Sequence, residues 1–96
     1  MIAAKKVYPD HGHPEGVKVI PWYRLIEGKF YPDYGHPEGE QSKSWFMLIG
    51  EKVYTDEGHP VGRMSTAWFR LAGDRLYPDG GHPEGAKDES WFRIFE

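Results

Sequence analysis

Residues 29–39 read Lys-Phe-Tyr-Pro-Asp-Tyr-Gly-His-Pro-Glu-Gly, and residues 44–49 read Ser-Trp-Phe-Met-Leu-Ile. Related copies of both stretches recur at steps of 23 residues along the 96-residue chain. A fixed period of this kind shows that the protein consists of four copies of one unit. We call these copies repeats 1 to 4, and they cover approximately residues 6–28, 29–51, 52–74 and 75–96.

The composition favours strands and turns over helices. Gly (12) and Pro (8) are abundant, and aromatic residues make up 16% of the chain. Gly and Pro supply turns, while large rings favour strands and can fill a small core. A chain of 96 residues is long enough for one domain. We therefore expect a single all-β domain.

Charge and hydropathy argue against several classes of function. The formal net charge is −3, so we expect no basic surface for a phosphate backbone and no nucleic-acid partner. No apolar run reaches about 18 residues, so we expect no membrane span. Residues 1–6 lack the apolar segment of a signal peptide, which makes a cytoplasmic location the expectation. The absence of cysteine agrees with that location and excludes disulfides and Cys-ligated metals.

Two consecutive turns precede each tryptophan. In repeat 1, residues 9–12 (Pro-Asp-His-Gly) suit a compact loop, because Pro presets φ and the Asp side chain accepts nearby backbone N–H groups. Residues 13–16 (His-Pro-Glu-Gly) predict a second β-turn, with Pro at its second position and Gly at its end. The two turns reverse the chain and expose the residues between them.

A tight hairpin follows each tryptophan. Residues 22–26 are an expected strand, and the Glu27-Gly28 loop that follows is typical of a two-residue hairpin turn. This turn places Leu25 opposite Phe30, so the last strand of one repeat pairs with the first strand of the next. The core face predicted from this register carries Tyr23, Leu25 and Phe30, with their copies Phe46, Leu48, Val53, Phe69, Leu71, Leu76, Phe92, Ile94 and Val7.

The opposite face of the hairpin is amphipathic. It is expected to carry Trp22, Arg24, Ile26, Lys29 and Tyr31. Arg24 lies opposite Tyr31 in the predicted register, and the pair can interact through the aromatic ring.

The two ends of the chain are expected to close the sheet. Lys6 lies where the repeat pattern would place a lysine after the fourth tryptophan strand, so residues 2–8 can pair with residues 91–96. Closure removes exposed sheet edges, which a small β protein needs. We predict an all-β, pseudo-four-fold closed barrel or mini-toroid of about eight hairpin strands. A small propeller, an open solenoid and a ring of several chains are the alternatives.

The Asp and His residues of the turns are the first candidate site. In a closed ring they lie on one rim, where inward imidazoles could hold a divalent metal ion. Outward Asp–His pairs could instead orient a hydroxyl-rich or amide ligand. In a purely structural role, Asp would accept backbone N–H groups and His would pack on a neighbouring aromatic ring. The candidates are Asp10, Asp33, Asp56 and Asp79 for a ligand, and His13, His36, His59 and His82 for a ligand or a metal ion.

Tryptophan and arginine form the second candidate site. Aromatic faces beside Arg suit the stacking of sugars or planar groups, and a site in each repeat would bind multivalently. Alternatively, each tryptophan packs between hairpins. Glu15, Glu38 and Glu84 could contribute, whereas Val61 takes that position in repeat 3. The candidates are Trp22, Arg24, Trp45, Trp68, Arg70, Trp91 and Arg93, with Met47 in place of arginine in repeat 2.

Motifs of enzymes are absent from the sequence. It contains no Gly-rich phosphate loop, no Gly-x-Ser-x-Gly and no His-Glu-x-x-His. Four equal Asp–His pairs do not resemble one tuned active site. We therefore predict a non-catalytic binding module for a small-molecule, glycan, peptide or protein ligand. A metal-binding structural protein and an enzyme with an Asp–His pair are the alternatives, and the oligomeric state is left open because the same hairpin could pair between chains.

Overall fold

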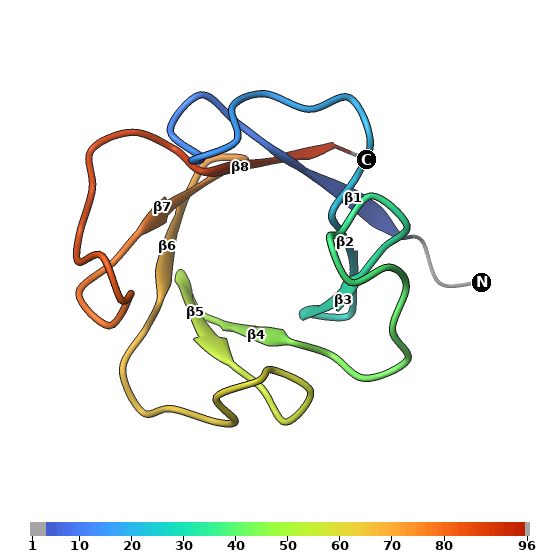
Figure 1. Ribbon diagram of the computed structural model, residues 1–96. Helices are drawn as coiled ribbons and strands as arrows, with labels where there is room; N and C mark the ends of the chain where they lie inside the picture. Colours follow the sequence, from blue (N-terminus) through green and yellow to red (C-terminus); the bar gives the residue numbers. More distant parts are fainter. Residues whose placement is uncertain (1–3, 96) are drawn as a thin grey trace.

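The protein is a closed barrel of eight antiparallel strands, as the computed structural model of residues 4–95 shows (Figure 1). These residues form no helix, and so none that is long and apolar enough to cross a membrane. The strands are β1 (Lys5–Pro9), β2 (Tyr23–Ile26), β3 (Lys29–Pro32), β4 (Phe46–Ile49), β5 (Lys52–Thr55), β6 (Phe69–Ala72), β7 (Arg75–Pro78) and β8 (Phe92–Phe95).

The barrel closes between the first strand and the last. Every strand pairs with its neighbours in the chain, and β8 pairs with β1. Val7 lies opposite Ile94 in this pair, as Phe30 lies opposite Leu25 in β2–β3. The predicted closure is confirmed. Residues 2, 3 and 96 of the two predicted end strands lie outside the described residues.

The predicted hairpin register is confirmed as well. Across the Glu27–Gly28 turn, Ile26 lies opposite Lys29 and Leu25 opposite Phe30, as expected for a two-residue loop. Four residue pairs join β2 to β3 within this hairpin, whereas only two join β3 to the next hairpin at β4. The strands of this hairpin are therefore paired over a greater length than the strands that join it to the next hairpin.

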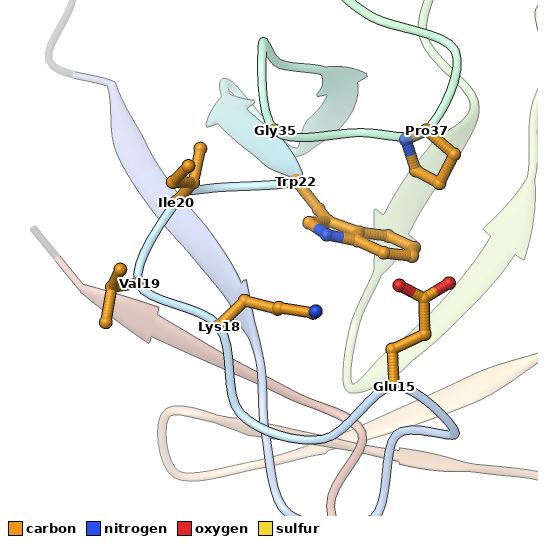
Figure 2. Close-up of a pocket in the computed structure, with 7 residues that line it drawn as sticks. All are labelled: Glu15, Lys18, Val19, Ile20, Trp22, Gly35 and Pro37. Atoms are coloured by element: carbon orange, nitrogen blue, oxygen red, sulfur yellow. The ribbon is translucent and has the colours of Figure 1, made fainter.

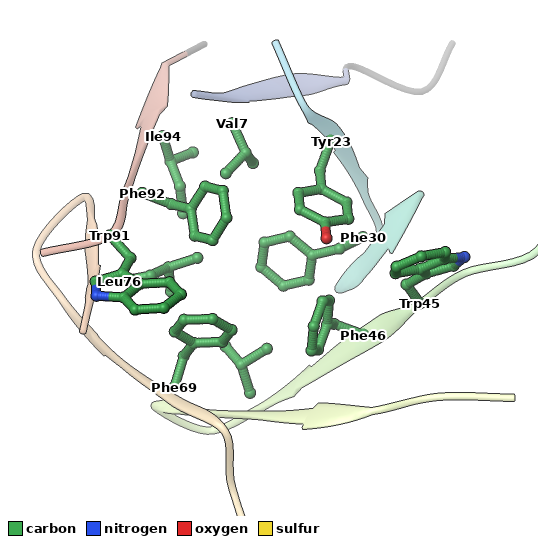
Figure 3. Packing of buried hydrophobic residues seen from close by; sticks show 11 residues of the cluster. Val7, Tyr23, Phe30, Trp45, Phe46, Phe69, Leu76, Trp91, Phe92 and Ile94 are labelled. Atoms are coloured by element: carbon green, nitrogen blue, oxygen red, sulfur yellow. The ribbon is translucent and has the colours of Figure 1, made fainter. Parts of the chain in front are cut away.

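Alternate side chains fill the inside of the barrel (Figure 3). Aromatic and aliphatic residues point to the axis from all eight strands, in agreement with the predicted core face. Leu25, Leu48 and Leu71 are only partly buried because they lie at one end of the barrel. The buried apolar residues are Val7, Tyr23, Phe30, Trp45, Phe46, Val53, Phe69, Leu76, Trp91, Phe92 and Ile94.

The tryptophans do not share the outer face with the arginines, which corrects one expectation. Trp22 precedes β2, which begins at Tyr23, so the alternation of the strand does not extend to it. Trp45 and Trp91 belong to the core, and Trp22 and Trp68 pack against it. The predicted alternation therefore holds only from Tyr23 onward.

Candidate functional site, an aromatic cup at one end of the barrel

Each His-Pro turn places its histidine between two tryptophans. The His13 ring centroid lies 4.5 Å from that of Trp22 and 5.2 Å from that of Trp91, in edge-to-face geometry. Equivalent contacts of 4.6–5.2 Å recur at the other three histidines. Four imidazoles and four indoles therefore alternate in one closed ring, namely His13, Trp22, His36, Trp45, His59, Trp68, His82 and Trp91.

A backbone hydrogen bond fixes the orientation of each imidazole. Nδ1 of His36 accepts the N–H of Glu38 at 3.1 Å, and the other three histidines accept the N–H two residues further on in the same way. A neutral imidazole whose Nδ1 accepts carries its proton on Nε2. The ring thus holds four imidazoles of one tautomer.

The four histidines of this ring are neutral near pH 7. Burial lowers the pKa of His36 and of His59 to about 4, because the charged form loses its hydration among aromatic rings. Burial also lowers the pKa of His13 and of His82. The ring consequently carries no positive charge at neutral pH.

Four further rings close the barrel beneath the histidines. Tyr23, Phe46, Phe69 and Phe92 contact one another in turn, with centroids 5.6–5.7 Å apart. Tyr23 is the one hydroxyl in this layer, and its oxygen lies 3.3 Å from Nε2 of His36. Because that nitrogen carries the proton, it donates to the Tyr23 hydroxyl. These rings form the floor of the site.

The two layers line an open aromatic cup of about 290 Å³. Its wall is the histidine–tryptophan ring, its floor is the layer of Tyr23 and the three phenylalanines, and Pro37, Glu38 and Pro60 complete the lining. Among residues 4–95, Glu38 is the one carboxylate that lines the cup, and no lysine or arginine does so. The site is therefore concave, aromatic and weakly acidic.

The aspartates of the turns do not pair with the cup histidines. Oδ1 of Asp56 accepts the backbone N–H of Glu57, and Oδ2 accepts from Nζ of Lys29 at 2.9 Å. Asp10, Asp33 and Asp79 each accept the next backbone N–H as well. The structural role considered for Asp is the one these contacts support. Each aspartate has a basic partner from the preceding repeat, in the ion pairs Lys6–Asp33, Lys29–Asp56, Lys52–Asp79 and Arg75–Asp10, and Asp56 also pairs with Arg63 of its own repeat.

These contacts keep the aspartates ionised. For Asp56, burial acts to raise the pKa, but hydrogen bonds from Ser44, Lys29, the Glu57 N–H and Arg63 together lower it. The pKa values of Asp10 and Asp33 are lowered by similar contacts against the effect of burial. For Asp79, the hydrogen bond from Lys52 is the main cause of the lowered pKa.

The predicted arginines lie outside the cup. The guanidinium of Arg24 stacks on Tyr31 at 5.4 Å, as the register predicted, and Arg70 stacks on Tyr77 at 5.2 Å. Arg93 lies over Phe95 and contacts Asp10. Since none of the three lines the cup, the arginines and the tryptophans form separate features.

The four histidines do not converge on a metal site. Within residues 4–95, no group of three or more His, Cys, Asp or Glu side chains is arranged to hold a metal ion. In each imidazole Nδ1 already accepts a backbone N–H, and Nε2 carries the proton, so neither nitrogen offers a free lone pair. The ring contacts of these histidines are with tryptophans and with one ring each of the layer beneath them, not with one another.

Trp22 and Trp91 each also border a groove on the outside of the cup. Figure 2 shows the groove between repeats 1 and 2, of about 390 Å³, where Glu15 and Lys18 lie beside Trp22. The equivalent groove between repeats 4 and 1 has acidic residues, Asp88 and Glu89, in place of the apolar pair Val19 and Ile20. The outer grooves thus differ between repeats, whereas the cup is nearly uniform.

The floor residues and two prolines were missing from the predicted site. Tyr23, Phe46, Phe69 and Phe92 were assigned to the core, which is also where they lie. Only the closed circle of histidines and tryptophans above them shows that these four side chains also face a cavity. The available signal was the common spacing of His and Trp, but spacing alone does not place the two rings in contact.

Comparison of the chain with family models, with curated proteins and with solved structures found no match in any of the three. Function must therefore be inferred from the geometry of the cup and its surroundings.

Proposed function

We propose that this protein is a non-catalytic binding module that takes a small ligand, or a single side chain of a larger partner, into the aromatic cup. The observation that carries the proposal is the closed histidine–tryptophan ring around a cavity of about 290 Å³. Concave sites lined mostly by aromatic side chains with few polar groups are the usual form of small-ligand sites. A cup of this size suits one small group.

The chemistry of the lining supports binding over catalysis. The aspartates that could serve as acid or base are held by lysines, an arginine and backbone N–H groups away from the cup histidines. The imidazoles are alike in tautomer, and each has a lowered pKa. A general acid or base works best with a pKa near the operating pH, whereas burial lowers the pKa of His36 and raises that of Tyr23, both away from neutrality.

NMR titration of the histidine side chains tests this proposal. Four of the five histidines surround the cup, whereas the side chain of His11 is 76% exposed and lies outside it. A library of small sugars, amines, carboxylates and aromatic compounds is screened, and Cε1–H shifts are followed. Binding in the cup is expected to shift the four cup histidines and to leave His11 unchanged. Ligands that shift no cup histidine at millimolar concentration would count against a cup-binding function.

A further inference from the structure

The charge at the mouth of the cup is not the same in every repeat. Glu15, Glu38 and Glu84 occupy the same turn position, but only Glu38 lines the cup, and Val61 replaces the glutamate in repeat 3. The charge of Glu38 also acts on the floor of the cup. Burial is the main cause of the raised pKa of Tyr23, and the Glu38 carboxylate adds to it. Glu15 and Glu84 act electrostatically on His13 and His82, so Glu38 is distinguished by its place in the lining of the cup.

Glu38 also differs from its counterparts in its surroundings. Lys87 lies 4.0 Å from Glu84, and Lys18 lines the outer groove beside Glu15. At the equivalent position repeat 2 has Gln41, whose side chain donates to the Glu38 carbonyl oxygen. Within residues 4–95, Glu38 forms no ion pair. Glu15 forms no ion pair among these residues either, but only repeat 2 of the three repeats with this glutamate has no lysine at the position that Lys18 and Lys87 occupy.

The cup offers few hydrogen-bond acceptors to a ligand. In each imidazole Nδ1 is already occupied by a backbone N–H, and Nε2 is a donor. A primary ammonium or a guanidinium buried in such a site would leave N–H groups without partners, which is costly. A cation that carries no such donors, or only one, avoids this cost. Aromatic rings and a nearby carboxylate both attract such a cation.

On the basis of the proposed binding function, we propose that the cup binds a methylated or quaternary ammonium group, with Glu38 as its counter-ion. The size agrees, because a cup of about 290 Å³ lies at the lower end of the range for ligand sites and suits a trimethylammonium head group. The same head group can come from a free small molecule or from a methylated lysine side chain.

Choline and its uncharged isostere 3,3-dimethylbutan-1-ol form the decisive pair of probes. They differ in the positive charge but hardly in shape. We expect choline to bind about tenfold more tightly, as cation–π attraction and one carboxylate together would give. Binding is measured by histidine NMR shifts and by tryptophan fluorescence at low ionic strength. Equal affinities would overturn the inference but would leave the cup established as a binding site.

Variants at the turn glutamates test which carboxylate attracts the bound cation. Glu38→Gln is expected to weaken choline binding several-fold and to leave binding of the neutral isostere unchanged. Glu15→Gln is the matched comparison and is expected to cause a smaller loss, because Glu15 acts on His13 but does not line the cup. An equal loss in both variants would contradict a specific role of Glu38.

The source of the head group is tested with two further probes. Free trimethyl-lysine and a peptide that carries it are compared with choline. Tighter binding of the peptide would indicate a methylated protein partner, and tighter binding of choline a small molecule. If none of the three cations shifts the cup histidines while a neutral compound does, the ammonium inference is wrong and the binding proposal stands. If no compound at all shifts them, the binding proposal itself fails.

Discussion

At the scale of single residues, the glycine before each histidine is required by close packing. A Cβ atom at Gly35 would lie 2.5 Å from the Pro21 carbonyl oxygen, and one at Gly81 would lie 2.6 Å from that of Ala67. Gly12 and Gly58 face the same contact. Each of these glycines also donates its N–H to that carbonyl, so the turn cannot move away without losing a hydrogen bond.

The adjacent pair Gly80 and Gly81 gives a direct test of this packing. Gly81→Ala is expected to destabilise the protein by about 2 kcal/mol, because the new methyl group meets backbone and must displace the turn. Gly80→Ala is the control, since its Cβ meets nothing within 4 Å and its φ is not positive. It is expected to be neutral or slightly stabilising. Urea unfolding of both variants is the measurement, and equal midpoints would contradict the steric explanation.

At the scale of elements, ion pairs reinforce the short contacts between hairpins. Only two residue pairs join β3 to β4, whereas four join the strands within the hairpin. At this contact Lys29 reaches from β3 to Asp56, 27 residues later, and equivalent bridges join the other hairpins. Asp56 and its equivalents thus tie together the units that the sheet joins least.

Replacing these aspartates by asparagine tests their contribution. Asp56→Asn should cost about 3 kcal/mol, because this fully buried carboxylate accepts from Ser44, Lys29, Arg63 and the Glu57 N–H. Asp79→Asn should cost about 1 kcal/mol, since Asp79 is partly exposed. Chemical denaturation of the two variants provides the comparison. The explanation fails if Asp79→Asn proves the more damaging change.

The elements were more predictable from the sequence than the site. The Glu27–Gly28 loop determines the hairpin register by its length, and the repeat period shows that residues 2–8 can complete the ring. The lining of the cup is different, because Trp22 lies just outside the alternating pattern of β2. The direction of His13 is set by the Nδ1 hydrogen bond and by two rings from different repeats. Such contacts between repeats cannot be predicted from the alternation of residues along one strand.

At the scale of the whole molecule, the aromatic ring makes the fold depend on neutral histidine. Three of the cup imidazoles are buried among rings and that of His59 is half-buried, and each has a pKa below its ordinary value of 6.5. The unfolded chain therefore binds more protons than the folded protein when the pH lies between about 4 and 6.5. The aspartates act in a lower range, since their pKa values in the folded protein lie below 3.8. Loss of stability between pH 6.5 and 4 thus reports on the imidazoles.

We expect the free energy of unfolding to be nearly constant above pH 7 and to fall as the pH is lowered from 6.5 to 4. A shift of the pKa from 6.5 to about 4 corresponds to about 3 kcal/mol for each of His36 and His59, enough to unfold a domain of ordinary stability. Urea denaturation at a series of pH values measures this profile. His59→Gln should lower stability at pH 7 but flatten the slope, and His11→Gln, at an exposed position outside the cup, is the control. A loss of stability confined to pH values below 4 would show that the carboxylates, and not the aromatic ring of the cup, govern acid unfolding.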